Sequence, residues 1–318
     1  MKKIMSYFAI CAIVLSMASC GDGNVPEVKV HKSKIEGCLD GLFSVSATEQ
    51  VYFSKGNLQF QEYYLLDMQG GGEWIERWKF ANDQYDIFGD KNSSIALHVL
   101  APTDTRYIDL FGWGTGLAPT KHTTNNADYN YFGEWGNKPI FNGGNTYEQW
   151  RTLTKDEWLY LFQGRRDAAK LFGFGHIELS NGDLVKGVFL LPDIWDDAMR
   201  AEHNFHSAAE KGVEWLEGNF AYYSIPNDDD PYLYEHNEYK VTDKSWEKLE
   251  DAGAVFLPAA GYREDASVHK SWGYNECGWY WSSTPDNNDK SYFLYFSSTR
   301  LHPRRDNKYY GCSVRLVR

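Results

Sequence analysis

The sequence is short of positive charge. It has 32 Lys and Arg residues against 44 Asp and Glu residues, which gives a formal net charge of −12 at neutral pH. A negatively charged protein is repelled at long range by the phosphates of nucleic acids. We therefore expect no nucleic-acid partner.

Familiar catalytic signatures are also missing. The chain has no Gly-x-Ser-x-Gly elbow and no His-Glu-x-x-His motif. Gly112-Trp113-Gly114-Thr115-Gly116 lacks the lysine and the following helix of a nucleotide-binding loop, so we interpret it as a turn around Trp113. Paired carboxylates for glycoside hydrolysis converge only in three dimensions. We predict no catalytic residue and no cofactor, with a glycan-acting enzyme as the alternative.

Cysteine is scarce. The chain has five cysteines, of which Cys11 and Cys20 lie near the N-terminus. The body contains Cys38, Cys277 and Cys312. In an oxidising compartment we expect either a Cys277–Cys312 disulfide or three reduced cysteines.

Only one long apolar run is present, and it lies at the N-terminus. Lys2 and Lys3 precede an apolar run that extends to Ala18, and Met17-Ala18-Ser19-Cys20 follows the pattern of a signal-peptide cleavage site. These four residues resemble the lipobox of bacterial lipoproteins. The resemblance implies removal of residues 1–19, lipidation of Cys20, and a lipid-anchored protein of the cell envelope, exposed at the outer membrane surface. The run is short for a spanning helix, which needs about 20 residues, so a transmembrane anchor is the weaker alternative.

Beyond the anchor, the composition points to a folded domain. Residues 20–40 are polar and irregular, typical of a flexible spacer, and residues 41–318 form the predicted domain. Aromatic residues make up 16% of the chain, with 12 Trp and 22 Tyr, more than a core requires. Some of them are expected to be contact residues at a surface.

The apolar pattern predicts an α+β fold. We expect a β-hairpin over 43–60 with its turn at 55–57, and long loops with short strands over 61–150. Helices are expected from Thr154, where Thr154 and Glu157 form a capping box, across 243–251, and less distinctly across 196–211. Extended segments are expected at 187–192 and 253–258, and an antiparallel meander of strands at 278–284, 291–297 and 311–317.

Several motifs then occur in a recognisable order. They are Trp150-Arg151-Thr152-Leu153-Thr154-x-x-Glu157-Trp158, Phe256-Leu257-Pro258-Ala259-Ala260-Gly261-Tyr262-Arg263, Tyr280-Trp281-Ser282-Ser283-Thr284 and Gly311-x-Ser313-Val314-Arg315-Leu316-Val317. This order resembles bacterial paralogous surface proteins with a C-type-lectin-like fold, the fold that also contains the formylglycine-generating enzymes. The resemblance implies antiparallel sheets, two or three short helices and long loops.

Some members of that family with this C-terminus resemble the variable proteins of diversity-generating retroelements, in which exposed codons near the gene's end are rewritten. The resemblance implies a fixed framework of Trp281, Ser282, Ser283, Thr284, Ser313, Val314 and Arg315. The residues it implies as ligand-binding are Asp286, Asn287, Asn288, Phe293, Tyr295, Ser297, His302, Arg304, Arg305, Asp306, Asn307, Tyr309, Tyr310 and Cys312. Their mixture of rigid aromatic and adaptable polar side chains is typical of a binding surface. The alternative is that the aromatic side chains pack beneath the loops of 61–150.

Metal and oxidase chemistry are not expected. Formylglycine-generating enzymes need a closely spaced cysteine pair near the C-terminus, where this chain has only Cys312. The calcium ligands of classical C-type lectins are missing at Trp281-Ser282-Ser283. Asp228-Asp229-Asp230 is more simply a solvated acidic loop, and His203 with His206 lacks a third ligand at a recognisable spacing.

These observations predict a ligand-binding module whose C-terminal sheet contacts a protein or a glycan. Residues 299–318 contain six Lys or Arg residues and one acid, so an acidic partner is favoured.

Overall fold

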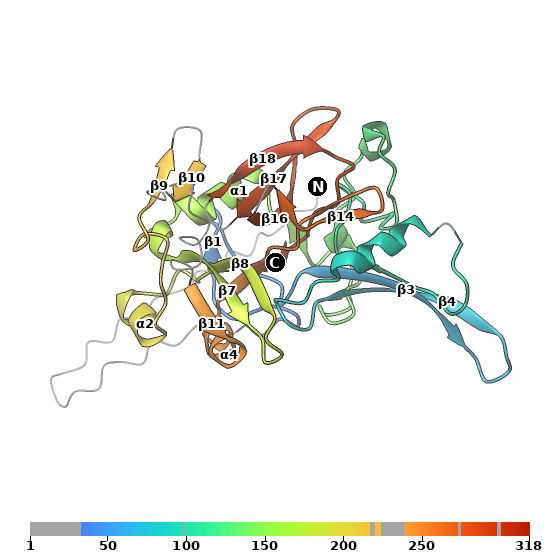
Figure 1. Ribbon diagram of the computed structural model, residues 1–318, viewed down its shortest axis with the longest axis horizontal. Helices are drawn as coiled ribbons and strands as arrows, with labels where there is room; N and C mark the ends of the chain where they lie inside the picture. The colour runs from blue at the N-terminus through green and yellow to red at the C-terminus, as the bar shows by residue number, and fades with distance from the viewer. Residues whose placement is uncertain (1–32, 98, 217–219, 224–238, 273–274, 298–299) are drawn as a thin grey trace, which may run out of the picture.

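Antiparallel strands and a few short helices make up the chain (Figure 1), so the predicted α+β class is confirmed. This computed structural model describes residues 33–97, 99–216, 220–223, 239–272, 275–297 and 300–318. The predicted signal peptide, Cys20 and the acidic run Asp228–Asp230 lie outside the described residues. Within the described part, no helix combines the length and the apolar character that a membrane crossing requires.

The largest sheet has six strands in the order β15-β16-β17-β18-β10-β9. Their bounds are Ser271–Trp272, Asn275–Pro285, Lys290–Ser297, Arg300–Asn307, Phe220–Tyr223 and Val213–Leu216, respectively. The strands predicted at 278–284 and 291–297 are confirmed as antiparallel neighbours, because they fall within β16 and β17.

The prediction of the third strand of the meander was wrong. The third strand is β18, which pairs with β17, and not the segment 311–317. β18 was missed because Pro303 and a run of cationic side chains hide the alternation that marks a strand. The apolar C-terminal segment runs through the interior instead: β19 (Leu316–Val317) pairs with β6 (Arg151–Thr152).

Strand β16 separates two hydrophobic cores. Trp279 and Trp281 point to one side, and Tyr280 points to the other, as the two-residue period of a strand requires. The Trp279 side packs against large residues from 58–150, including Trp78 and Trp135. The Tyr280 side packs against residues of the α1 region, β8 and β12. Both faces of this part of the sheet are therefore covered.

The segment 61–150 contains more regular structure than we predicted. β3 (Leu58–Leu66) and β4 (Gly72–Phe80), each of nine residues, form a hairpin, and β5 (Thr105–Ile108) pairs with the other edge of β3. The predicted hairpin over 43–60 was wrong, because β1 (Phe43–Ser44) pairs with β2 (Gln50–Val51), and the 55–57 turn leads into a different sheet. The rest of this segment is loops and short 3-10 turns at Gly89–Ala96, Asn126–Tyr129 and Trp135–Asn137.

The two extended segments predicted at 187–192 and 253–258 lie side by side. β8 (Leu184–Leu190) and β12 (Val255–Pro258) are antiparallel neighbours in the four-stranded sheet β11-β7-β8-β12. β7 (Phe172–Glu178) pairs with β8, and with β11 (Tyr239–Thr242) in parallel. The remaining small hairpin joins β13 (Tyr262–Glu264) to β14 (Ser267–His269).

Two predicted helices are confirmed. α1 (Lys155–Leu159) begins with the Thr154–Glu157 capping box and continues as a π-helical turn over Tyr160–Gly164, followed by a 3-10 turn at Ala168–Lys170. α4 (Asp243–Asp251) buries Trp246 and Leu249. The third predicted helix, 196–211, is limited to α2 (Asp197–Glu202), since the chain turns at Asn204, where φ is 49°.

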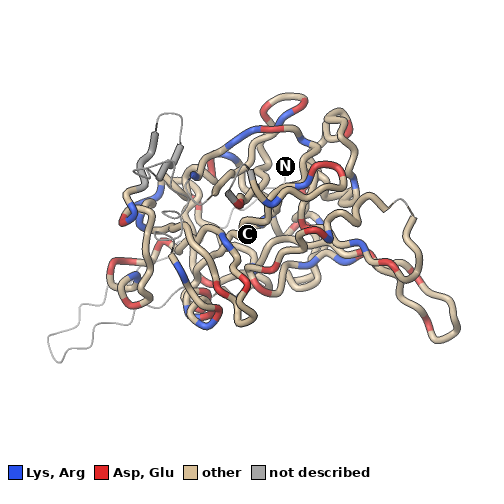
Figure 2. Tube along the Cα trace, viewed as in Figure 1, with Lys and Arg blue, Asp and Glu red and all other residues tan. Residues whose placement is uncertain are grey.

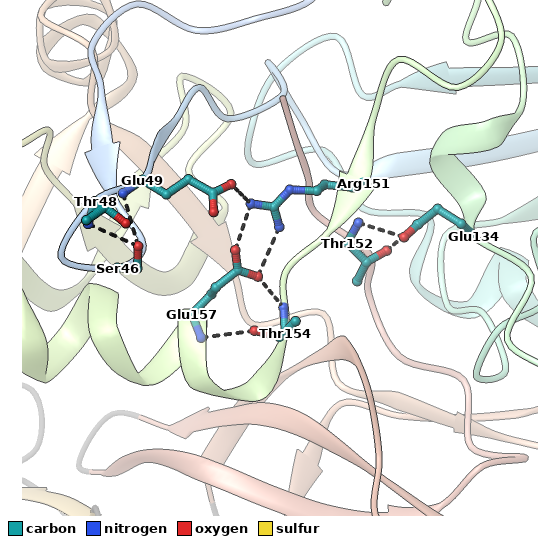
Figure 3. Close-up of polar contacts among 8 residues, drawn as sticks. All are labelled: Ser46, Thr48, Glu49, Glu134, Arg151, Thr152, Thr154 and Glu157. Atoms are coloured by element: carbon teal, nitrogen blue, oxygen red, sulfur yellow. Dashed lines mark hydrogen bonds and ion pairs between the residues drawn. The ribbon is translucent and has the colours of Figure 1, made fainter. Parts of the chain in front are cut away.

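A polar network ties the N-terminal strands to α1 (Figure 3). The Arg151 guanidinium lies between two carboxylates, 2.6 Å from Glu49 and 2.7 Å from Glu157. Glu157 also closes the capping box with Thr154, so one carboxylate serves both the helix and the ion pair. On the other side, the Thr152 hydroxyl and amide donate to Glu134.

The N-terminal part of the domain and the C-terminus lie side by side. Tyr52 and Arg318 exchange two backbone hydrogen bonds, with N···O distances of 2.8 and 2.9 Å. The backbone of Cys38 forms an isolated antiparallel β-bridge with Ser54 in the neighbouring segment. Leu39, from the range predicted as a spacer, is buried in the core and donates its amide to the Phe53 carbonyl, so the described residues 33–40 pack onto the domain near its C-terminal end.

Asp109 makes the fold sensitive to pH. Its carboxylate accepts hydrogen bonds of 2.6 Å from the Phe88 amide and from the Asn92 side chain. Burial raises its pKa to about 6 despite these bonds. The folded state then holds the proton more tightly than the unfolded state, whose pKa is near the ordinary value of 3.8. Stability contributed by protonated Asp109 is present below pH 3.8 and is lost as the pH rises through 6.

We predict that the difference in unfolding free energy between wild type and Asp109→Asn falls by up to ~3 kcal/mol as the pH rises through this window. Urea denaturation at a series of pH values between these limits measures the difference. Parallel stability curves for the two proteins would contradict the shifted pKa.

Candidate ligand-binding surface

Strand alternation divides the predicted ligand-binding residues between two faces of the sheet. Phe293 lies opposite Arg304 and Tyr295 lies opposite His302, so these four side chains share one face. Tyr292 lies opposite Arg305 on the other face. The structure therefore does not gather all predicted residues into one surface.

Four of the predicted residues are in the interior. Phe293, Tyr295, Ser297 and Cys312 are each no more than 5% exposed. The expectation that they lie on a surface was wrong, because aromatic side chains of 58–150 cover this face of the sheet. Phe293 and Tyr295 instead follow the alternative given above, in which the aromatic side chains pack beneath the segment 61–150.

On the second face, Asp286 holds its neighbours together. The Arg305 guanidinium lies 3.0 Å from the Asp286 carboxylate, and the Tyr292 hydroxyl donates to the same carboxylate at 3.0 Å. Lys155 lies over the Tyr292 ring at 5.0 Å. Asn287 and Asn288 are exposed in the following turn, where the Asn287 side chain accepts from the amides of Asp289 and Lys290.

On the first face, aromatic rings are stacked from the core to the surface. The Trp279 ring lies 4.4 Å from Phe293 and 4.5 Å from Tyr262, and Tyr262 lies 4.8 Å from His269, with all three pairs stacked. Tyr310 meets both Tyr262 and Trp279 edge-on. This stack fixes the position of the outer rings.

Cationic and polar side chains surround the stack. The Arg304 guanidinium lies 5.2 Å from the Tyr295 ring and 5.8 Å from the Trp279 ring. We call the partly exposed residues above Trp279 the Trp279 surface: Tyr262, His269, His302, Arg304, Tyr309 and Tyr310. Asp306 and Asn307 lie beside it, and Asn307 accepts from Asn126 and donates to the Tyr309 hydroxyl.

The sequence did not indicate Tyr262 and His269 as surface residues. They come from the β13–β14 hairpin, which brings them to β16 through the bridge between Gly261 and Gly278. Tyr262 stood within one of the recognised motifs, but its proximity to Trp279 depends on this long-range contact.

The Trp279 surface is less charged than the sequence predicted. Of the six cationic residues in 299–318, Lys308 and Arg315 are buried, and Arg305 is paired with Asp286. Burial, followed by the nearby Arg304 charge, lowers the pKa of His302 to about 4. His302 is therefore neutral at physiological pH, and Arg304 is the principal charge of the surface.

The predicted framework residues have structural roles. The Trp281 indole donates to the Phe111 carbonyl at 2.6 Å, and the Ser282 hydroxyl donates to the Tyr292 carbonyl at 2.7 Å. Ser283 and Thr284 contact the start of α1 through Leu153 and Lys155. Ser313 donates its amide to Trp279, Val314 is in the core, and Arg315 donates to Gln84. These residues hold the sheet in place.

In the described part of the chain, the cysteines and histidines considered in the sequence do not come together in one site. Cys277 and Cys312 are not joined by a disulfide, and burial raises the pKa of Cys312 well above its ordinary value. No group of three potential metal-binding side chains occurs among the described residues. The His203 ring lies 4.9 Å from the Trp195 ring in a tilted arrangement, whereas His206 lies 3.7 Å from Glu210.

A polar cleft of about 560 Å³ lies elsewhere, between the β1–β2 loop, the turn after α1 and the segment that enters α2. At its floor Arg165 lies 3.1 Å from Asp193. On its rim Lys170 and Arg200 both pair with Asp197. Its lining contains four cationic and four anionic side chains, so it favours neither charge: Arg165, Arg166, Lys170, Arg200, Asp167, Asp193, Asp196 and Asp197.

Comparison with known proteins adds one similarity. Residues 232–317 match a family described as a domain of unknown function, DUF8237. The matched span includes the meander and all six residues of the Trp279 surface. No curated protein and no solved structure matches the chain.

We predict that Phe293→Ala lowers the free energy of unfolding by about 3–5 kcal/mol, because it removes a fully buried ring from the stack. Tyr309→Ala is the matched control, since Tyr309 is partly exposed, and about 1 kcal/mol or less is expected. Urea denaturation measures both. Equal effects at the two positions would show that Phe293 is not a core residue.

Proposed function

We propose that the protein is a lipid-anchored cell-envelope protein that binds a protein or glycan ligand through the Trp279 surface. The observation that carries the proposal is the stack of Phe293, Trp279, Tyr262 and His269, which presents fixed rings beside Arg304. Rigid aromatic side chains lose little conformational entropy on binding, and their polar neighbours give specificity.

The proposed scaffold is a C-type-lectin-like fold. Its support is the order of the motifs along the sequence, together with the adjacency of Tyr52 and Arg318, which brings the two ends of the domain together. In the proposed arrangement, Cys20 is lipidated and the spacer joins the membrane to this end of the domain.

Cys20→Ala should then transfer the protein from the membrane fraction to the aqueous fraction.

An acidic ligand fits the exposed charge. Arg300 and Arg304 are on β18, and Figure 2 marks Lys and Arg positions (blue) along the trace of this strand. His302 contributes hydrogen bonds without adding charge. Binding should therefore weaken as salt concentration rises.

We predict that the triple variant His302→Ser, Arg304→Ser, Tyr309→Ser loses at least about tenfold in affinity for ligands that wild type selects from arrays of glycans and surface proteins. The control is His206→Ser, Arg166→Ser, Tyr147→Ser, which removes the same side-chain types elsewhere, one of them from the polar cleft, and should bind as wild type. Unchanged binding by the first variant, or turnover of a bound glycan, would contradict the proposal.

Retroelement diversification of this surface is a narrower proposal. Codons for exposed or partly exposed positions such as Asn287, Arg305 and Tyr309 can vary without disturbing the core, whereas those for Phe293 and Cys312 cannot. We expect a reverse-transcriptase gene and a near-copy of the gene's 3′ end nearby, with differences at template adenines. Sequencing the flanking DNA tests this, and the absence of both elements would make the surface one of fixed specificity.

A further inference from the structure

The hairpin formed by β3 and β4 projects from the rest of the chain (Figure 1). Its sheet has the order β4-β3-β5, so β4 is an edge strand. Apolar side chains near its tip are exposed: Leu65, Leu66, Met68 and Trp74. A long edge strand with exposed apolar side chains is a template for pairing with another strand.

The second half of this edge is already covered. The Phe141 amide donates to the Trp78 carbonyl at 2.8 Å, and the Asn142 side chain accepts from the Phe80 amide at 2.7 Å and donates to its carbonyl at 3.0 Å. The backbone groups of Trp78 and Phe80 therefore point away from β3.

In the first half of β4, the direction of the backbone N–H and C=O groups follows from the alternation along the strand. The N–H and C=O groups of Trp74 and Glu76 must also point away from β3, since both groups of every second residue share a direction. In the part of the chain that the structure describes, no strand pairs with this edge between Gly72 and Arg77. Four backbone hydrogen-bonding groups are thus presented by two residues.

We propose that two copies of this chain associate by antiparallel pairing of β4 with β4, with Ile75 opposite Ile75 of the second copy. Trp74 of one copy then exchanges two backbone hydrogen bonds with Glu76 of the second copy. The two-fold symmetry gives the same two bonds between Glu76 of the first copy and Trp74 of the second. A two-fold interface is self-complementary, as this pairing requires. The proposal is independent of ligand binding at the Trp279 surface.

The side chains fit this register. Glu73 lies opposite Arg77 of the second copy, and symmetry gives a second such pair. Both residues lie on the same face of β4 as Ile75, with Tyr63 opposite Ile75 on β3. One face of the joined sheet would thus have a central apolar row of Tyr63 and Ile75 from both copies, flanked by two ion pairs.

Neighbouring registers are less favourable. Pairing centred on Glu73 or on Glu76 places identical carboxylates directly opposite each other, which is destabilising. Pairing centred on Trp74 places Glu73 opposite Ile75 and leaves Arg77 opposite Gly71, without an ion pair. The charges therefore select Ile75 as the centre.

The test is sedimentation equilibrium of the purified protein between about 1 μM and 1 mM. Wild type should show a monomer–dimer equilibrium. Glu73→Arg or Arg77→Glu alone should raise the dimer dissociation constant about tenfold or more, because each places like charges together twice. The double exchange Glu73→Arg, Arg77→Glu should restore the wild-type constant, and Asp251→Arg on α4 should not change it.

Glu76→Pro tests the backbone pairing separately. It removes an N–H that points outward, so the β3 pairing is preserved and the variant should fold, which circular dichroism checks. The dimer should be lost. A wild-type protein that is monomeric throughout, a dimer that survives Glu76→Pro, or a charge exchange that fails to rescue the single variants would overturn the proposal.

Discussion

The alternation of β16 is the constraint on which the structure depends. Trp279 and Trp281 enter one core and Tyr280 enters the other, so a single strand forms the wall between two hydrophobic clusters. The Tyr280 hydroxyl donates to the Pro258 carbonyl at 3.0 Å and accepts from Asn57 at 3.0 Å, both within the interior. A change of register by one residue would exchange the two sets of side chains, so this strand has one stable position.

The same constraint determines which aromatic residues reach the surface. Since β17 pairs with β16, Phe293 and Tyr295 must follow Trp279 and Trp281 into the core beneath 58–150. β18 lies one strand further out, and there the same face carries Arg304 and His302, which are partly exposed. The candidate binding surface is therefore the outer part of a buried stack, and its rigidity comes from the core below it.

Buried cations stabilise the long connections of this fold. Arg263 is fully buried, and it donates to the backbone carbonyls of Leu110 and Asp265. Burial lowers its pKa to about 10, which leaves it charged at physiological pH. Arg315 is held similarly by the Gln84 side chain. Arg263 thereby supplies donors to backbone carbonyls on two segments and connects Leu110, in the 58–150 segment, to the β13–β14 hairpin.

The sequence by itself determined the features that depend on local interactions. The capping box at Thr154, the amphipathic helix 243–251 and the period-two segments of β16 and β17 were predictable because neighbouring residues define them. It also determined that residues near the C-terminus would combine rings with cations. Only the tertiary structure decided that β18 completes the meander, that Phe293 is buried, and that Tyr262 and His269 join Trp279. The reason is that alternation defines two faces without stating what covers either of them, and here the cover comes from segments more than a hundred residues away.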